Sequence, residues 1–368
     1  MRIAFVHDWL VVSGGAEKVT REILRTFDAD VFALIDFLND ADRAFILGGK
    51  RAKTTFIQHL PFARKHYRTY LPLFPSAIER LDLSGYDLVI SASYAVAKGV
   101  PKRPGQLHVC YIHTPMRYAW LREDDYLKDH RLSGIKAWGV RRVLQRLRAW
   151  DLKTNAGVDH FIANGINVAR RVRDLYGRDA EVLLPPVDTD LFALHQGERE
   201  HYLCASRLVP YKRVDRVIEA FRAMPRRTLL VAGDGPDRER LRASAPSNVR
   251  FLGHLPQTAL IEVMQRSKAV IAAADEDLGL TPLEAQACGT PTIALRKGGY
   301  LETVKDGMSG IFFDTDSPVD IIRSVERFDR TRLASPAELR EGMKTHSSER
   351  FREQFAAIVT HWLKEHGR

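Results

Sequence analysis

Short apolar runs alternate with helical patterns along the whole chain. In the first half, runs rich in β-branched and aromatic residues have the length of buried strands. The predicted strands are residues 2–6, 30–34, 54–58, 87–92, 107–111 and 160–163. Apolar positions at helical spacing follow at residues 16–27, 115–121, 140–150 and 168–176.

The second half repeats this alternation. Its predicted strands are residues 202–205, 228–232, 249–252, 269–273, 292–295 and 310–313. Its predicted helices are residues 214–224, 238–245, 258–266, 282–288 and 320–327, and residues 336–366 form a helical tail. Strands alternating with helices predict an α/β fold with parallel sheets covered on both faces. Pro185 and Pro186 stiffen a connector. They predict two domains, 1–184 and 185–368, with the last helix packing back toward the first.

Composition narrows the class of protein. The chain has 368 residues, 45% hydrophobic and 28% charged, which excludes a disordered, collagen-like or coiled-coil protein. Cys110, Cys204 and Cys288 are odd in number and widely spaced, so neither a disulfide framework nor a cysteine zinc site is expected. No apolar run reaches the length of a membrane helix or a signal peptide. The expected location is therefore the reducing cytoplasm.

The net charge of +10 indicates an acidic partner, such as phosphate, nucleic acid or an anionic membrane. No nucleic acid is expected, because the sequence contains neither a known binding module nor stacking aromatics on a basic face.

Glycines and a histidine mark the strand ends of the first half. Gly14 and Gly15 directly precede a helix, where free N–H groups can bind an anion; the alternative is a plain turn. His113 follows a strand, with Pro115 two residues later. Because ligands bind at the carboxyl ends of parallel strands, His113 is a candidate catalytic residue. A structural histidine is the alternative.

Charged residues mark the strand ends of the second half. Arg207 and Lys212 lie five apart between a strand and a helix, where both can bind one phosphate group; solvated surface charge is the alternative. Glu276 follows the apolar run 269–273, and Glu284 is eight residues further on.

The segment between these glutamates predicts a helix start. Thr281 is expected as the N-cap and Pro282 as the first helical residue. Gly279 permits a close approach, so nearby amides can bind an anion. Glu284 could instead close a capping box with Thr281, an alternative that leaves Glu276 unexplained.

As a set, these motifs resemble family 4 of the retaining glycosyltransferases. The spacing from Glu276 to Glu284 is similar to the E-x7-E motif of that family. The other matching segments are Gly14-Gly15-Ala16-Glu17, His113-Thr114-Pro115, Arg207 with Lys212, and Gly233-Asp234-Gly235-Pro236. The strings His7-Asp8-Trp9, 111–120 and 185–192 most resemble bacterial mannosyltransferases that use GDP-mannose in surface polysaccharide assembly.

The resemblance implies the GT-B fold: two Rossmann-like, doubly wound domains facing a central cleft, with C-terminal helices. It implies that Arg207 and Lys212 bind the donor diphosphate, that Glu284 binds the ribose, and that Glu276 binds sugar hydroxyls. His113 would lie near the sugar and the acceptor. The remaining implied donor-binding residues are Gly14, Gly15, Asp277, Leu278, Gly279, Leu280 and Thr281. Backbone groups near residues 233–236 and 251–254 would read the base.

Two positions depart from the family pattern. Leu278 stands where phenylalanine is frequent, and Gly165 follows Asn164 where serine is common.

No metal or other cofactor is expected, because cations and amides already face the phosphates of the nucleotide-sugar co-substrate. The triplet Asp188-Thr189-Asp190 follows the Pro-Pro connector rather than a cleft loop. The resemblance implies transfer with retention. The alternatives are a UDP-sugar donor, or an epimerase or phosphorylase on the same fold.

Two basic segments bear on a saccharide or lipid-linked saccharide acceptor. Residues 131–153 carry seven Lys or Arg against Asp151 alone, beside an apolar stripe. Residues 64–68 are a second basic segment. Such helices bind anionic membranes, which predicts peripheral binding at the inner face of the cytoplasmic membrane. An ordinary helix packed on the core is the alternative.

Overall fold

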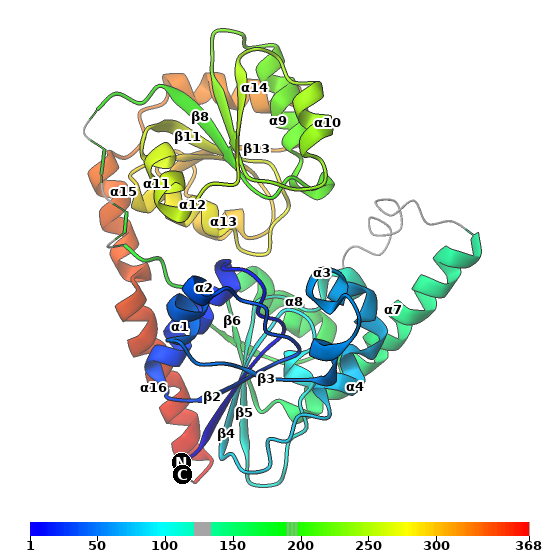
Figure 1. Cartoon of the computed structure of the whole chain (residues 1–368). Helices are drawn as coiled ribbons and strands as arrows, with labels where there is room; N and C mark the ends of the chain where they lie inside the picture. Colours follow the sequence, from blue (N-terminus) through cyan, green and yellow to red (C-terminus); the bar gives the residue numbers. More distant parts are fainter. Residues whose placement is uncertain (121–133, 190, 193, 196, 368) are drawn as a thin grey trace. The chain divides into compact units, whose positions relative to one another are not determined.

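A computed structural model describes residues 1–120, 134–189, 191–192, 194–195 and 197–367 (Figure 1). The chain forms two compact units. Unit 1 is Met1–Pro186 with Glu349–Arg368, and unit 2 is Val187–Ser348. The division follows Pro186, two residues after the position expected from the sequence, and the tail returns to unit 1.

Unit 1 is a parallel sheet in the order β3-β2-β1-β4-β5-β6-β7. Its strands are β1 (Ile3–His7), β2 (Asp30–Ala33), β3 (Lys53–Thr54), β4 (Leu88–Ser93), β5 (Leu107–Ile112), β6 (His160–Ala163) and β7 (Ala180–Val182). Its helices are α1 (Gly15–Thr26), α2 (Asp40–Leu47), α3 (Ala63–His66), α4 (Phe74–Ile78), α5 (Arg117–Trp120), α7 (Gly134–Thr154), α8 (Ile166–Tyr176) and α16 (Ser348–Glu365). The 3-10 helices in the described part of this unit are η1 (Phe56–His59), η2 (Tyr67–Leu73), η3 (Ala97–Gly99) and η4 (Asn155–Gly157).

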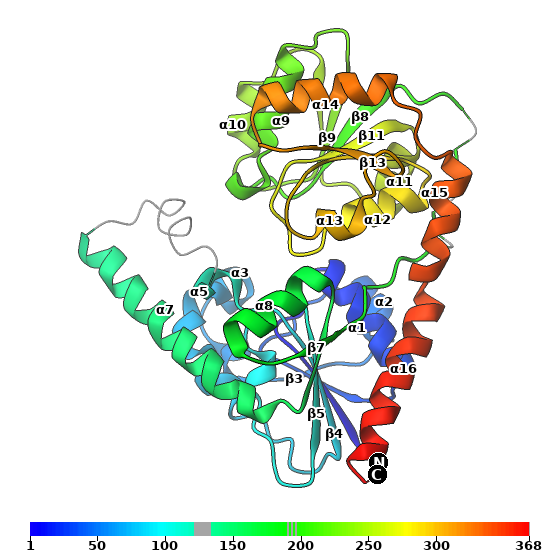
Figure 2. The same cartoon turned by 180° about the vertical axis from the view of Figure 1, so that it is seen from behind.

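Alternate residues of β1 serve different cores. Ile3 and Phe5 pack in a cluster with residues of α1 and α16, whereas Ala4 and Val6 pack in a cluster with residues of α4 and α7. Side chains of a strand point alternately to the two faces of its sheet. The helices therefore cover both faces, and α7 and α16 lie on opposite sides of the sheet (Figure 2).

Unit 2 repeats the topology in the order β10-β9-β8-β11-β12-β13, again all parallel. Its strands are β8 (His201–Ala205), β9 (Leu229–Ala232), β10 (Val249–Gly253), β11 (Ser267–Ala272), β12 (Thr292–Leu295) and β13 (Gly310–Phe313). Its helices are α9 (Val214–Arg222), α10 (Arg238–Ala243), α11 (Gln257–Gln265), α12 (Leu280–Ala287), α13 (Tyr300–Thr303), α14 (Pro318–Arg330) and α15 (Pro336–Gly342), with 3-10 helices η5 (Pro210–Lys212) and η6 (Met343–His346).

Both sheets reverse their strand order beside the first strand of the unit, between β1 and β4 and between β8 and β11. Loops leave in opposite directions at such a switch point, so the carboxyl ends of these strands frame a crevice. The residues that follow β1, β4, β8 and β11 are therefore the first candidates for function.

One predicted strand is largely wrong. Of residues 54–58, only Thr54 belongs to a strand, and Phe56–His59 form η1. The Thr55 hydroxyl accepts a hydrogen bond from the Ile57 amide at 3.3 Å. This local bond caps the 3-10 turn and takes the chain out of the sheet.

The last helix, α16, packs on unit 1 (Figure 1). Phe355 contacts Phe27 of the segment after α1, and Trp362 stacks on His160 of β6 with ring centroids 4.1 Å apart. These aromatic contacts explain why the tail belongs to the unit that is distant in sequence.

Candidate functional site

In unit 2, a charge pair lies at the switch point. Lys212 ends η5 after β8, and Glu276 lies on the loop after β11. The Lys212 ammonium donates to Oε1 of Glu276, and the two side chains are 18% and 15% exposed. The structure thus brings together two residues that the sequence assigned to different parts of a donor, and it pairs them with each other.

The loop that carries Glu276 packs closely against Gly299. The Gly299 amide donates to the Glu276 carbonyl at 2.8 Å. A Cβ at Gly299 would lie 2.1 Å from the Leu278 Cα, so no other residue fits without moving the loop. Sequence reasoning missed this support, although the pair Gly298-Gly299 directly after an apolar strand was its visible signal.

The start of α12 corrects the sequence analysis. The N-cap is Gly279 with φ of 86°, and Leu280 is the first helical residue. Thr281 is therefore not the cap, and Pro282 is the third helical residue. Glycine adopts this left-handed φ without strain, so the helix begins two residues earlier than expected. Glu284 is the fifth helical residue, which excludes the capping box.

The two residues before that cap are buried. Asp277 is 8% exposed and Leu278 is 4% exposed. Leu278 therefore fills an apolar position where the family pattern has phenylalanine.

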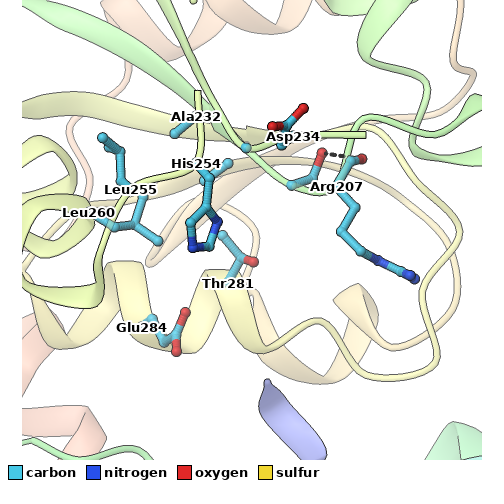
Figure 3. Close-up of a pocket in the computed structure, with 11 residues that line it drawn as sticks. Arg207, Ala232, Asp234, His254, Leu255, Leu260, Thr281 and Glu284 are labelled. Carbon is cyan, nitrogen blue, oxygen red and sulfur yellow. Dashed lines mark hydrogen bonds between the residues drawn. The ribbon is translucent and has the colours of Figure 1, made fainter. Parts of the chain in front are cut away.

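A cavity of about 250 Å³ opens beside this helix start. Its apolar wall includes Ala232, Leu255 and Leu260, and its polar wall includes Thr281 and Glu284. Figure 3 shows the His254 ring pointing toward α12, between Thr281 and Glu284. The sequence predicts a role only for backbone groups near His254, and the structure adds its side chain to the site.

Arg207 also lines the cavity, but its side chain extends away from His254 and Glu284 (Figure 3). It is exposed, and its guanidinium donates to the Tyr211 hydroxyl at 2.7 Å. Arg207 and Lys212 therefore have different partners in this structure. Their predicted convergence on one phosphate stays a prediction.

In unit 1, His7 fixes the glycine loop. Buried at the end of β1, its Nδ1 lies 3.2 Å from the Thr20 hydroxyl and its Nε2 lies 3.4 Å from Glu17 Oε1. The other Glu17 oxygen accepts from the Gly14 amide at 3.0 Å. Gly14 and Gly15 are thus held at the start of α1 by a charged network that the sequence did not reveal.

His113 follows β5 directly, and its Nε2 is buried without a hydrogen-bond partner among the described residues. Burial lowers the pKa of His113 to about 3, and His7 also lowers it. A neutral imidazole results, next to the Tyr94 and Tyr111 rings.

Asn164, at the end of β6, also has a buried polar atom, Oδ1, without a partner among the described residues. Strand β6 lies beside β5 in the sheet. Gly165 caps α8 without a side-chain hydrogen bond. A buried polar atom without a partner is costly, so two of them at adjacent strand ends indicate a place for a ligand.

The apolar stripe of α7 faces the core. Leu144 and Leu147 are buried, and Val140, Val143 and Trp150 pack against the same cluster. Asp151 is fully buried and pairs with the buried Lys98 at 3.0 Å. The stripe is therefore that of an ordinary packed helix. Arg131 lies outside the described residues.

Neither a metal cluster nor a membrane span is found within the residues that the structure describes. No group of three or more His, Cys, Asp or Glu side chains among them could hold a metal ion. No helix among them is long and apolar enough to cross a membrane. Asp190 of the acidic triplet lies outside the described residues.

Two family models match consecutive parts of the chain. Residues 13–191 match Glycosyltransferase Family 4, and residues 190–348 match Glycosyl transferases group 1. Each match covers a little under half of the chain, and together they show similarity to glycosyltransferases over residues 13–348.

Curated relatives share parts of the sequence. A D-inositol 3-phosphate glycosyltransferase of Thermomonospora curvata is 31% identical over 229 residues, which cover 50% of this chain and 53% of the relative. A GDP-mannose-dependent α-(1-6)-phosphatidylinositol monomannoside mannosyltransferase of Mycolicibacterium smegmatis is 36% identical over 165 residues, 36% of this chain and 43% of the relative. The chain thus spans about half the length of the curated relatives it matches.

A solved structure shares the fold. The Anabaena protein HepE in complex with UDP and glucose matches with a TM-score of 0.69 and 18% identity, over 98% of this chain and 99% of that one. With two Rossmann-like parallel sheets in the chain, this confirms the predicted GT-B fold.

Proposed function

We propose that this chain is a retaining hexosyltransferase that transfers mannose from GDP-mannose to a saccharide or lipid-linked saccharide in surface polysaccharide assembly. The observation that carries the proposal is the unit 2 cavity, with the Lys212–Glu276 pair at the same switch point. A nucleoside diphosphate needs an apolar wall for its base, a carboxylate for its ribose hydroxyls and cations for its phosphates.

In this proposal, the base lies near Leu255 and Leu260 and the ribose hydroxyls bind Glu284. Arg207 and Lys212 stabilise the negative charge that develops on the diphosphate, helped by the N-terminus of α12. Glu276 binds hydroxyls of the transferred sugar.

The acceptor is proposed to bind unit 1, where His113 Nε2 is buried without a partner among the described residues. The bond from the sugar C1 to the phosphate oxygen breaks as the acceptor oxygen attacks C1 from the same face. The acceptor proton passes to the departing phosphate.

The donor is the open choice within this proposal. The mycobacterial relative is named as GDP-mannose-dependent, whereas HepE binds UDP and glucose. A UDP-sugar is therefore the second candidate. A thermal-shift panel of GDP, UDP and their sugars tests both, since a ligand that binds only the folded protein raises the Tm.

GDP and GDP-mannose are expected to give the largest shifts, and Glu284→Gln is expected to reduce them. Glu239→Gln is the matched control, because Glu239 is an exposed residue of α10 outside the cavity lining. Larger shifts with UDP would transfer the proposal to a UDP-sugar. No shift with any nucleotide would refute it.

Transfer is proposed to need no divalent metal, since Arg207, Lys212 and helix amides supply the positive charge. Sugar transfer should therefore persist in EDTA. Loss of activity in EDTA and its recovery with magnesium or manganese would contradict this.

The proposed location is the cytoplasmic side of the membrane that carries the acceptor. The net charge of +10 supports attraction to an anionic surface.

A further inference from the structure

Phe62 holds a backbone conformation that bulky residues rarely adopt. Its φ is 56° and its ψ is 13°, and Arg213 is the one other described non-glycine residue with a positive φ. In this left-handed region the Cβ of an L-residue crowds its own backbone. Strain of this kind persists where the surroundings fix it, and it often marks a functional position.

Packing does not explain the strain, because the Phe62 side chain is 81% exposed. It is the most exposed large hydrophobic side chain among the described residues. The ring therefore gains little from the fold of this chain, while water surrounds most of its apolar surface. Such a ring is stabilised when an external apolar phase takes it up.

The turn around Phe62 is held by short-range hydrogen bonds. The Phe62 carbonyl accepts from the His66 amide at 2.9 Å, and the Tyr70 hydroxyl donates to the Pro61 carbonyl at 2.7 Å. Beneath it, Tyr67 and Phe74 are buried in the core. These bonds hold the backbone that carries the ring, which lowers the cost of ordering the segment when the ring is taken up.

The surface around the ring carries positive charge. Arg64, Lys65 and Arg68 are exposed, and the sequence from Arg51 to Ile78 contains neither Asp nor Glu. Leu73, 42% exposed, adds a second apolar side chain. We call residues 59–73 the Phe62 turn.

We infer that the Phe62 turn binds the surface of an anionic lipid bilayer, with the Phe62 ring among the headgroups and Arg64, Lys65 and Arg68 on the lipid phosphates. An exposed aromatic ring flanked by cations is the combination that interfacial anchors use. In α7, by contrast, the apolar stripe of Val140, Leu144 and Leu147 is packed on the core. The inference deepens the proposed function, because it places unit 1 at a membrane where a lipid-linked acceptor would lie.

Vesicle cosedimentation tests the inference without donor or acceptor. The protein should bind vesicles of phosphatidylcholine with phosphatidylglycerol more strongly than vesicles of phosphatidylcholine alone. It should dissociate from the anionic vesicles as salt is added. Phe62→Ser should lower the partition coefficient roughly 10- to 100-fold, the effect of withdrawing one buried aromatic ring. Replacing Arg64, Lys65 and Arg68 with Gln should lower it roughly 100-fold.

Two variants test whether a loss of vesicle binding reflects unfolding or the removal of any exposed aromatic ring. Phe62→Gly should leave the Tm unchanged or raise it, because glycine relieves the positive φ, and it should still lose vesicle binding. Trp138→Ser is the matched control: it removes an exposed aromatic ring of α7 (66% exposed) and should keep wild-type binding.

Several results would overturn the inference. They are wild-type binding by Phe62→Ser, a lower Tm in Phe62→Gly, or an equal loss of binding in Trp138→Ser. A salt-insensitive dimer that Phe62→Ser dissociates, without vesicle binding, would assign the ring to self-association instead. If no nucleotide binds unit 2, the proposed function fails while the vesicle assay still decides this inference.

Discussion

Replacing Glu276 with glutamine is expected to tighten the binding of GDP while it slows sugar transfer. In the structure the Lys212 ammonium is bonded to the Glu276 carboxylate. A diphosphate must therefore compete with that carboxylate for Lys212. Glutamine keeps the shape of the side chain but removes its charge, so Lys212 becomes more available to phosphate.

The magnitude follows from burial. Both side chains are less than one-fifth exposed, so their attraction exceeds the 0.2–1 kcal/mol typical of exposed pairs. An intermediate value of about 1–2 kcal/mol corresponds to roughly 5- to 30-fold tighter GDP binding. Turnover is expected to fall about 10²-fold, because the proposed contact of Glu276 with the transferred sugar is lost.

Titration calorimetry with GDP and steady-state rates with the nucleotide sugar measure the two effects. Asp275→Asn is the matched control, since Asp275 lies on the same loop and pairs with Lys297 at 3.2 Å. It removes the same charge from the loop without touching Lys212. Weaker or unchanged GDP binding in Glu276→Gln, or equal tightening in Asp275→Asn, would refute the competition.

Three further predictions concern single residues. Arg207→Ala should lower turnover about 10²- to 10³-fold with little change in Tm, because Arg207 is exposed; near wild-type turnover at saturating donor would exclude it from the diphosphate site. Glu284→Gln should chiefly weaken the binding of GDP itself. Equal GDP affinities of the wild type and the variant in calorimetry would show that Glu284 does not bind the ribose. His113 has a pKa near 3 in the folded protein and near 6.5 when unfolded. The unfolded state therefore binds the extra proton as the pH falls below 6.5, and stability is lost toward pH 3. His113→Gln should make this acid loss shallower in urea titrations, and an unchanged slope would contradict the buried neutral imidazole.

Much of the fold could be predicted because the strands are buried on both faces. Stretches such as Ile3–His7 and Leu107–Ile112 are apolar except for one histidine each, and every residue in them is buried. The predictions that were wrong concern the ends of single elements. The Thr55 side chain ended a predicted strand early, and the left-handed Gly279 moved a helix start. Single hydrogen bonds and single φ angles of this kind leave no periodic trace in a sequence.

The sequence predicts which strand ends carry the residues of the candidate site, but not which of these residues contact each other. The sequence located Lys212, Glu276 and Glu284 after the correct strands, since loop position follows from the alternation of elements. It did not predict the Lys212–Glu276 pair, because residues 64 positions apart meet only through the strand order. The role of Gly299 was hidden for the same reason, since its neighbour Leu278 comes from another loop.

The two units use one topology for different chemistry. In unit 1 the first carboxylate after β1, Asp8, accepts hydrogen bonds at 2.6–2.9 Å from the amides of residues 94–97 after β4. Burial raises the pKa of Asp8, and these donors oppose the rise. The switch point of unit 1 is thus closed by its own backbone. At the ends of the next strands, β5 and β6, the neutral His113 and Asn164 each have a buried polar atom without a partner among the described residues. In unit 2 the same position holds a cation and a carboxylate that a charged ligand can separate. This difference is why the proposed function assigns the phosphates of the donor to unit 2 and an uncharged acceptor hydroxyl to unit 1.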